Sequence, residues 1–488
     1  MTSHERSEDD NKEILQARAS VQITPDAIQP DPQLTHDRFS KKEKWSIVIF
    51  TAFVGFFRDF LEIMYSLVED LHLAPMLWGP VSDHVGRRPI SAVCLLILTL
   101  SCIGLALVPT SDYWLLMVLR CLQATGSAST IAIGAGVVGD ISNRAERGGF
   151  FGVFTIGPMI GPAIGPVIGG VLSDKLGWRS IFWFLCIAAA ICFIIIVLFQ
   201  PETLLSISNK NKENTFLIYK PVIPLIGRKK SDKVSVKSKS KIPRNPFRLF
   251  LNPDVDVLLL ISALTCAVFY ALLATISTLF IETYPFLTET TTGLCFLAMG
   301  GGMAIGSTAI GRILDIEYQQ FKKSMEARLV GTTSKVDVNR EENFPLEKAR
   351  LRLMPFFSAI LGVTCAGYGW CIQRKVNIAA PLILHFITGF ISISVMNASS
   401  TLMIDLVPGQ SSSVTACNNL IRCTLSAAIV SVIELIIKAI GTGWTYVIMS
   451  SMSFLSLPLI YLAIRIGPRY RAKRQRLREE ESTRMVEE

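Results

Sequence analysis

The sequence predicts an all-α polytopic membrane protein, and three observations lead to this fold class. Half of the 488 residues are hydrophobic and only 18% are charged, whereas soluble proteins usually carry about a quarter charged residues. Uncharged stretches exceed the roughly 20 residues that a helix needs to cross a bilayer, for example the 26 residues between Lys438 and Arg465. Basic residues gather between these stretches. In lipid each stretch must be helical, because no water satisfies a free backbone amide.

From residue 89 onward the apolar pattern predicts ten membrane-spanning helices. Their ranges are 89–109, 113–138, 149–172, 180–200, 256–281, 291–311, 353–373, 377–404, 412–438 and 441–464. A basic linker, 201–250, separates the first four from the last six, and a polar stretch, 316–350, divides two of the later spans. Because basic loops stay in the cytosol, we expect both linkers and both termini on the cytoplasmic side.

These boundaries predict two helical bundles, the first of them incomplete. We expect an N-terminal bundle over 45–200 and a C-terminal six-helix bundle over 251–465. Residues 1–44 are polar, lack the apolar core of a signal peptide, and are expected to form a disordered cytosolic tail. Residues 466–488 are expected to form a second, charged cytosolic tail.

The region 45–78 is too short for two ordinary spans. It holds 34 residues, where two spans need about 40 and a turn. Only residues 45–57 are continuously apolar, and charged residues such as Arg58, Asp59 and Glu62 follow. A single crossing here would invert every later loop and place the basic linker outside. We therefore expect either a distorted hairpin that returns to the cytoplasmic side or a segment that does not cross.

The cysteines and the enzyme motifs argue against several other classes of protein. All eleven cysteines lie within or beside apolar stretches, and none has the spacing of a metal site or a disulfide framework. HExxH, GxSxG and Walker motifs are absent from the sequence, so we expect neither an enzyme nor a nucleotide-driven pump. The net charge of +9 sits in loops and tails, a distribution that indicates a membrane protein without a nucleic-acid partner.

Two polar motifs mark the first half of the chain. The segment GPVSDHVGRRP begins at Gly79 and places two arginines at the start of a span; alone, these could be snorkelling anchors. In LLMVLRCLQATGSAST, Arg120 lies about seven residues inside a span. An intramembrane arginine is by default functional, with snorkelling to the outer surface as the alternative. Gln123 and Ser127 have helical spacing from Arg120 and share its face.

A glycine repeat is the strongest motif. In GVFTIGPMIGPAIGPVIGG, four glycines recur every four residues, prolines follow three of them, and the last is doubled. The glycines are Gly157, Gly161, Gly165, Gly169 and Gly170, with Pro166 among the prolines. A four-residue glycine period creates a bare groove on one helix face, where a second helix can approach closely. Gly302 and Gly306 are candidates for the facing groove, and a general packing face is the alternative.

The span 412–438 carries polar residues that we take as candidates for a substrate path and for proton coupling. Asn418, Asn419 and Arg422 lie in its first half, and Glu434 lies near its outer end. Arg422 and Glu434 are about 18 Å apart along a helix and cannot pair. Glu434 is either a proton or cation site or an interfacial residue paired with Lys438. His385, Phe182 and Trp183 are interpreted as packing or interface residues.

These motifs resemble those of the twelve-helix drug:proton antiporters of fungi, a family of the major facilitator superfamily. The resemblance spans about residues 75 to 465, and RCLQATGSASTIAIGAGVVGDIS, RAERGGFFGVF and FPLEKARLR place it near exporters of quinidine, polyamines and dityrosine. It implies a cytoplasmic latch that stabilises the outward-facing state. The latch residues are Gly79, Asp83, Gly86, Arg87, Arg88 and Asp140. Gly311, Arg312 and Asp315 form its decayed echo in the second half.

The resemblance implies proton-coupled export of drugs, polyamines or similar amphipathic or cationic compounds by alternating access. It implicates Arg120 in proton coupling. From the residues themselves, Glu434 is a second candidate for proton coupling, and Gln123, Ser127, Asn418 and Arg422 are candidates for the substrate path. No cofactor is expected, since the proton gradient supplies the energy. The partners are a small-molecule substrate, protons and the lipid bilayer, with the chain a monomer in the plasma membrane or an internal one such as the vacuole. The alternative, based on the short 45–78 region, is a degenerate, non-transporting paralogue or a regulatory binding partner.

Overall fold

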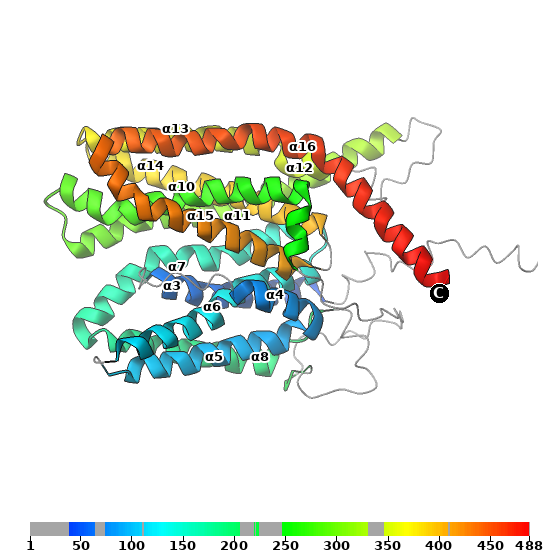
Figure 1. Ribbon diagram of the computed structural model, residues 1–488, viewed down its shortest axis with the longest axis horizontal. Coiled ribbons are helices and arrows are strands. Elements are labelled where there is room, and N and C mark those ends of the chain that lie inside the picture. The colour runs from blue at the N-terminus through cyan, green and yellow to red at the C-terminus, as the bar shows by residue number, and fades with distance from the viewer. Residues whose placement is uncertain are drawn as a thin grey trace, which may run out of the picture.

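The computed structural model describes residues 39–63, 74–109, 112–204, 219, 221–223, 246–329, 346–407 and 410–487. These residues form helices joined by short connections. The long helices run side by side in two bundles (Figure 1). The N-terminal bundle contains α3 (Lys41–Ile63), α4 (Ala74–Val85), α5 (Arg87–Leu107), α6 (Tyr113–Ile141), α7 (Arg147–Leu176) and α8 (Arg179–Phe199). The C-terminal bundle contains η3 (Pro246–Leu251), α10 (Pro253–Thr283), α11 (Glu289–Leu329), α12 (Leu346–Leu351), α13 (Met354–Gln373), α14 (Ala379–Leu406), α15 (Ser411–Ile440) and α16 (Thr442–Glu487).

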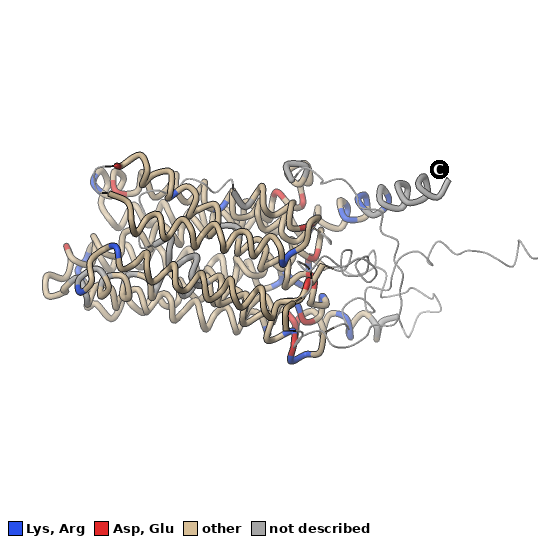
Figure 2. Tube along the Cα trace, turned by 90° about the horizontal axis from the view of Figure 1, so that it is seen from below, with Lys and Arg blue, Asp and Glu red and all other residues tan. Residues whose placement is uncertain are grey.

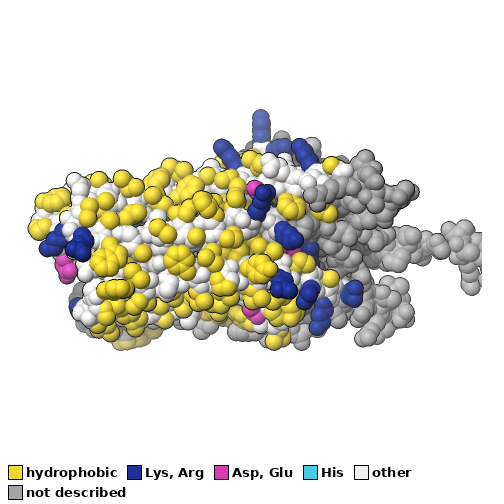
Figure 3. Space-filling model, turned by 90° about the horizontal axis from the view of Figure 1, so that it is seen from above, with side chains coloured by type: hydrophobic (Ala, Val, Ile, Leu, Met, Phe, Trp, Pro, Cys, Tyr) yellow, Lys and Arg dark blue, Asp and Glu magenta, His cyan; other side chains and the backbone are white. Residues whose placement is uncertain are grey.

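Nine of the described helical segments are long and apolar enough to cross a membrane, and they coincide with nine of the ten predicted spans. The tenth prediction falls on α7, a continuous helix of 30 residues. Figure 2 shows charged residues gathered at the two ends of the molecule, and Figure 3 shows an apolar surface between them. We call the end that carries the C-terminus the basic end, and the opposite end the outer end.

Each bundle has its own hydrophobic core, and the two cores meet towards the basic end. Leu98, Leu185 and their neighbours fill the space between α3, α5 and α8. In the second bundle, a large core includes Met76 of α4 and Ala132 of α6. A further cluster around α3, α6 and α7 includes Ile404 of α14. Apolar contact across the two bundles therefore involves the parts of α4, α6 and α14 that lie towards the basic end.

The 45–78 region forms a long helix and a short one. Helix α3 has 23 residues, and α4, on the far side of 64–73, has only 12. Both have contacts at the basic end: Lys44 pairs with Glu146 between α6 and α7 at 3.7 Å, and α4 leads directly into α5. Residues 64–73, which would form the turn, lie outside the described part, so the distorted hairpin stays a prediction. At 1.5 Å per residue, α4 covers about 18 Å, which leaves the outer part of α15 largely exposed.

The C-terminal residues 466–487, predicted as a charged tail, continue α16 as a helix. Two acids of the C-terminal bundle hold this extension. Arg471 pairs with Glu347 at 3.6 Å, and Arg474 pairs with Asp254. Figure 1 shows the extension leaning away from the bundle beyond the basic end. The prediction missed it because the extension is polar and carries no apolar periodicity.

The glycines of α7 bring two different helices close to it. A side chain on Gly157 would overlap the carbonyl oxygen of Ala52, so α3 lies directly against this part of α7. Nearer the basic end, a Cβ on Gly152 would approach the backbone of Ser307 in α11. Gly161, Gly165 and Gly169 are buried, whereas the surroundings of Pro166 and Gly170 lie outside the described part.

Gly302 and Gly306 do not face α7, contrary to the prediction. A Cβ on Gly302 would overlap the carbonyl oxygen of Phe386, and one on Gly306 would lie 2.6 Å from that of Phe390. Both glycines therefore allow α14, a helix of the same bundle, to pack closely against α11. The prediction failed because a bare groove indicates a close partner but does not identify it.

Candidate functional site

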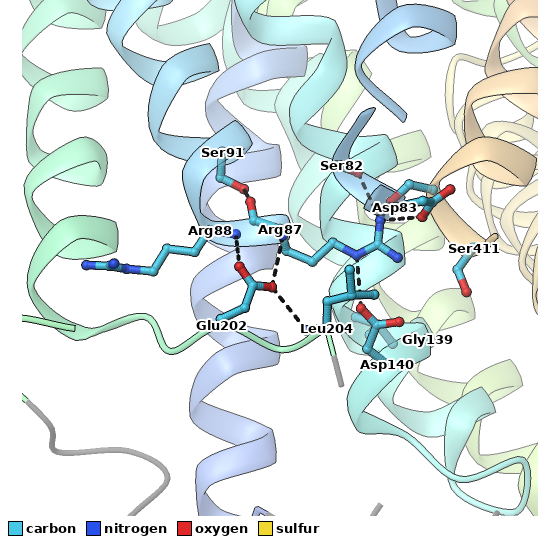
Figure 4. A network of polar contacts seen from close by, with 12 residues as sticks. Ser82, Asp83, Arg87, Arg88, Ser91, Gly139, Asp140, Glu202, Leu204 and Ser411 are labelled. Atoms are coloured by element: carbon cyan, nitrogen blue, oxygen red, sulfur yellow. Dashed lines mark hydrogen bonds and ion pairs between the residues drawn. The ribbon is translucent and has the colours of Figure 1, made fainter. Parts of the chain in front are cut away.

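A buried arginine organises a first charged cluster at the basic end (Figure 4). Arg87, in the first turn of α5, is fully buried. Its Nε donates to Asp140 at the end of α6 at 2.9 Å, and its Nη1 donates to Asp83 and to Ser82 of α4. Nη1 also donates to Ser412 of α15 at 2.6 Å. One guanidinium therefore joins three helices of the first bundle to a helix of the second.

Asp83 extends this cluster to the N-terminus of α15. Its Oδ2 accepts hydrogen bonds from the backbone amide of Ser413, at 3.1 Å, and from the Ser413 hydroxyl. A carboxylate in this position satisfies a free amide and complements the positive end of the helix dipole. Gly79 permits the approach, since a Cβ there would lie 3.0 Å from the carbonyl oxygen of Ser412. The residues predicted as a latch thus lie together across the two bundles.

Glu202, just beyond α8, completes the first cluster and was not predicted. Its carboxylate accepts from the backbone amides of Arg87, Arg88 and Leu204 at 2.9, 3.2 and 3.0 Å, and so caps α5. Burial raises the pKa of Glu202 above its ordinary value, although the three amide donors oppose this. Gly86 has a φ of 121° and a Cβ there would lie 2.6 Å from Glu202, so only glycine fits.

A second charged cluster surrounds Asp405 in the last turn of α14. Asp405 is 1% exposed and lies between two arginines of different bundles. Arg147, the first residue of α7, donates to its Oδ1. Arg350 of α12 contacts its Oδ2 at 3.1 Å and also donates to the backbone of Arg144 at 2.6 Å. This cluster also crosses the bundles, and Arg147 donates to the carbonyl of Gly139, next to Asp140 of the first cluster, at 3.2 Å.

Asp315 of α11 repeats the arrangement of Asp83. Its two carboxylate oxygens accept from the backbone amides of Gly148 and Gly149, at 2.9 and 2.7 Å, at the N-terminus of α7. In each case an acid from the second helix of one bundle, α4 or α11, caps the fifth helix of the other, α15 or α7, when η3 and α12 are left out of the order. The two bundles are thus related as repeats of one unit.

The same relation corrects the predicted echo of the latch. Asp315 takes part, but Arg312 is exposed on α11. Arg350 instead approaches Asp315 at 3.9 Å and pairs with Asp405 as Arg87 pairs with Asp140. Proximity in sequence favoured Arg312, whereas the long segment before α12 moves the functional arginine 35 positions beyond Asp315. Its only sequence signal was the motif FPLEKARLR.

A neutral polar cluster joins the bundles deeper in the membrane. Asn397 of α14 donates from Nδ2 to Thr155 of α7 at 2.9 Å and to Ser307 of α11 at 2.8 Å. The Thr155 and Ser307 hydroxyls are 2.7 Å apart, and all three side chains are buried. Because two of these helices belong to one bundle and α7 to the other, relative movement of the bundles must break the cluster.

Arg120 lies in the outer half of α6. Its Nη1 donates to Gln123 at 3.0 Å, and its guanidinium stacks over the Phe182 ring at 4.7 Å. Phe182 is therefore packed beneath the arginine, whereas Trp183 is exposed at the surface. Ser127 donates to the carbonyl of Ala124 in its own helix at 3.4 Å. Arg120 and Gln123 thus form one polar unit, and Ser127 is directed to the backbone.

The candidates on α15 separate into two groups. Asn418 and Asn419 are buried, and Arg422 is half-buried beside Cys266 and Tyr270 of α10. Glu434 is exposed near the outer end. Among the described residues no ion pair joins it to Lys438, which was its alternative partner.

His385 lies in an aromatic cluster of the second bundle. It is 1% exposed, with its ring 4.4 Å from Tyr368 and 5.8 Å from Phe280. These contacts agree with the interpretation of His385 as a packed residue.

Comparison with known proteins connects this arrangement to one family. The family model of the Major Facilitator Superfamily matches residues 63–431. Citrate exporter 1 of Aspergillus niger is 34% identical over 421 residues, which cover 85% of this chain and 79% of the exporter. Quinidine resistance protein 1 of Saccharomyces cerevisiae is 28% identical over 498 residues, which cover 92% of this chain and 88% of that protein.

Two solved structures share the fold. The proton:xylose symporter XylE matches with a TM-score of 0.60 at 10% identity, over 87% of this chain and 97% of the symporter. The human organic anion transporter MFSD10 matches with a TM-score of 0.56 at 18% identity, over 85% of this chain and 83% of the transporter.

Proposed function

Because the chain belongs to the major facilitator superfamily, and is therefore a multi-pass membrane transporter, we propose that it exports small organic molecules by proton-coupled alternating access. The observation that carries this proposal is the pair of related charged clusters at the basic end. Asp83 and Arg87 in one cluster, and Asp315 and Asp405 in the other, bind the two bundles together across their interface. They act as a latch that must open and close in every transport cycle.

The direction of transport follows from the resemblance and from the relatives. The glycine repeat of α7 resembles the motif of drug:proton antiporters, and its Gly157 fixes α3 against α7. Relatives named for citrate export and for quinidine resistance also favour export. We place the chain in the plasma membrane, with an internal membrane such as the vacuole as the alternative, and expect it to work as a monomer.

Arg120 supports proton coupling in this proposal. It is a permanent charge within the apolar part of α6, held by Gln123 and Phe182, and a charge at this depth is costly without a function. Glu434 is the weaker candidate, because it is exposed near the outer end of α15. The proton gradient is the energy source, without a cofactor.

Two classes of substrate are compatible with this proposal. The motifs resemble those of exporters of amphipathic and cationic drugs and of polyamines. The name of quinidine resistance protein 1 points to the same class of substrate. Citrate exporter 1, by contrast, is named for an organic acid.

The competing proposal is a non-transporting membrane protein, and the 12-residue length of α4 favours it. Efflux measurements distinguish the two. Cells that express the chain are loaded with quinidine or with citrate, and efflux is followed with and without an uncoupler. We expect efflux against a concentration gradient that the uncoupler abolishes. Uncoupler-resistant efflux contradicts proton coupling, and absence of efflux for both compounds favours the non-transporting protein.

Arg120→Ala tests the coupling residue. We expect it to abolish uphill efflux while downhill exchange continues, because the charge is needed for coupling rather than for the path. Lys175→Ala, an exposed change at the outer end, is the control with the same loss of charge. Uncoupler-sensitive efflux at the normal rate in Arg120→Ala would remove Arg120 from the proposal.

A further inference from the structure

Positive residues outnumber negative ones among the charged residues inside the predicted spans. Between residues 89 and 464, and apart from the first and last residues of each span, the predicted spans contain three charged residues: Arg120, Arg422 and Glu434. The two arginines are half-buried, whereas Glu434 is exposed near the outer end. The balance of charge at these inner positions of the predicted spans is therefore positive; α3, with Asp59 and Glu62, lies outside this comparison.

Unsatisfied hydrogen-bond donors lie beside Arg422. Asn419 is 7% exposed, and its Nδ2 has no hydrogen-bond partner among the described residues. The Nε of Arg422 also lacks one. The two residues are three positions apart on α15, so their side chains share one face of the helix. A buried donor without a partner costs free energy. Here one of the two donors belongs to the cationic guanidinium and the other to the neighbouring amide, so an acceptor group with negative charge could satisfy both.

We propose that Arg422 and Asn419 bind a carboxylate group of the transported substrate, which makes the substrate an organic anion. This inference rests on the proposed export function and specifies its substrate class. A carboxylate has two acceptor oxygens, which match the Nε of Arg422 and the Nδ2 of Asn419 in number and in charge.

The sign of the charge selects between the two substrate classes. At an effective dielectric constant of about 20, an arginine changes the binding constant of a singly charged ligand group about 6 Å away by roughly a hundredfold. The change favours an anion and opposes a protonated amine. Polyamines and cationic drugs would need acidic residues at this depth. Among the described spans, Asp256 lies ten residues before Cys266 on α10, towards the basic end, and Glu434 is exposed near the outer end.

Arg120 lies too far from Arg422 to share a small anion with it. Arg422 lies 11 residues from the start of α15, or about 16 Å from the basic end, and Arg120 lies 21 residues from the end of α6, or about 31 Å. The difference of about 15 Å exceeds the length of a small di- or tricarboxylate. Arg422, near the latch, therefore binds the carboxylate alone, and Arg120, held by Gln123 and Phe182 within the first bundle, keeps its coupling role.

Binding and efflux of two probes, citrate and quinidine, test the inference. For the purified full-length chain in detergent, we expect citrate to raise the thermal midpoint and quinidine to leave it unchanged. Arg422→Gln should weaken citrate binding at least tenfold, and Asn419→Ala several-fold. Arg422→Lys keeps the charge but loses the planar donor pair, so it should retain an intermediate affinity and show that the site needs charge as well as geometry.

Lys438→Gln is the matched control, because it removes one positive charge from the exposed outer end of the same helix. It should bind citrate as the unmodified chain does. Citrate affinity that is equal in Arg422→Gln and Lys438→Gln overturns the site. If Arg422→Gln does not fold, the same comparison is made with Arg422→Lys and Asn419→Ala.

The efflux results separate this inference from the proposed function. Uncoupler-sensitive efflux of quinidine without binding or efflux of citrate leaves the proposed function standing and overturns the carboxylate assignment. Absence of efflux and binding for both probes contradicts both. Citrate efflux that Arg422→Gln abolishes and Lys438→Gln preserves supports both.

Discussion

A single buried carboxylate, Asp405, holds two arginines that come from different bundles. Replacement of Asp405 by Asn leaves both guanidinium groups without their counter-charge in a buried position. We expect Asp405→Asn to lower the free energy of unfolding by about 3–5 kcal/mol, the typical cost of breaking a buried pair. Thermal unfolding in detergent measures this loss. Arg312→Gln, an exposed change on α11, should stay within about 0.5 kcal/mol of the unmodified chain; an equal loss in both variants contradicts the assignment.

Glu202 makes a pH-dependent contribution to stability. Burial raises its pKa in the folded chain, so the folded state binds a proton more tightly than the unfolded state. The stability from this group is greatest below the unfolded pKa of about 4.3, and it falls as the pH rises through the folded value. We expect Glu202→Gln to flatten this slope when thermal midpoints are measured between pH 4 and pH 8. A slope that Glu202→Gln leaves unchanged assigns the titration to another group.

At the residue scale, Asp83, Arg87 and Asp140 of the first charged cluster could be predicted, whereas Glu202 and the second cluster could not. Asp83 and Arg87 lie within one short motif, so their spacing alone placed them on adjoining turns. Arg147, Arg350 and Asp405 are separated by segments of 50 residues and more, and each resembles an ordinary charge at the end of a span. Their association depends on how the helices pack, which residue type and spacing do not encode.

At the scale of elements, α7 depends on bare glycine faces. A Cβ at position 157 would overlap the carbonyl oxygen of Ala52, so α3 must move if Gly157 is replaced. We expect Gly157→Ala to cost about 1–3 kcal/mol, the usual penalty for overpacking. Gly293→Ala on α11 is the matched control, since its nearest neighbour would be 4.0 Å away; thermal midpoints of the two variants make the comparison. A tolerated Gly157→Ala would show that the two helices are not held this closely.

The spans were predictable as elements because long apolar runs in a bilayer allow one structure only. The ends of α11 and α16 were not, since both helices continue far beyond their apolar parts, to Leu329 and Glu487. The α16 extension depends on ion pairs with Glu347 and Asp254, which lie more than 100 residues away in sequence. Likewise, the glycine pattern of Gly302 indicated close packing but assigned it to the wrong helix.

For the whole molecule, the two caps on α15 and α7 should contribute independently to closure of the basic end. Asp83→Asn weakens one cap and Asp315→Asn the other. With Cys417, which is 1% exposed, as the sole remaining cysteine, maleimide labelling reports opening. We expect each change to raise the labelling rate about tenfold and the double change about 100-fold, because effects at separate sites add in free energy.

Glu282→Gln, an exposed change at the outer end, should leave the labelling rate unchanged. A double variant that labels no faster than either single variant would mean that the two caps open as one unit. In that case the symmetry of the two clusters describes their geometry and not their energetics.

The short α4 has a consequence for how the protein is made. A helix of 12 residues spans about 18 Å of a hydrocarbon core of about 30 Å, so it offers the insertion machinery little apolar length to recognise. Its contact with the second bundle includes the bond between Asp83 and Ser413, 330 residues later in the chain. Until α15 has been synthesised, α4 lacks this partner and depends on α5 and α6. The first bundle therefore completes its assembly only after the second has entered the bilayer, which makes the nascent N-terminal hairpin the step most exposed to quality control.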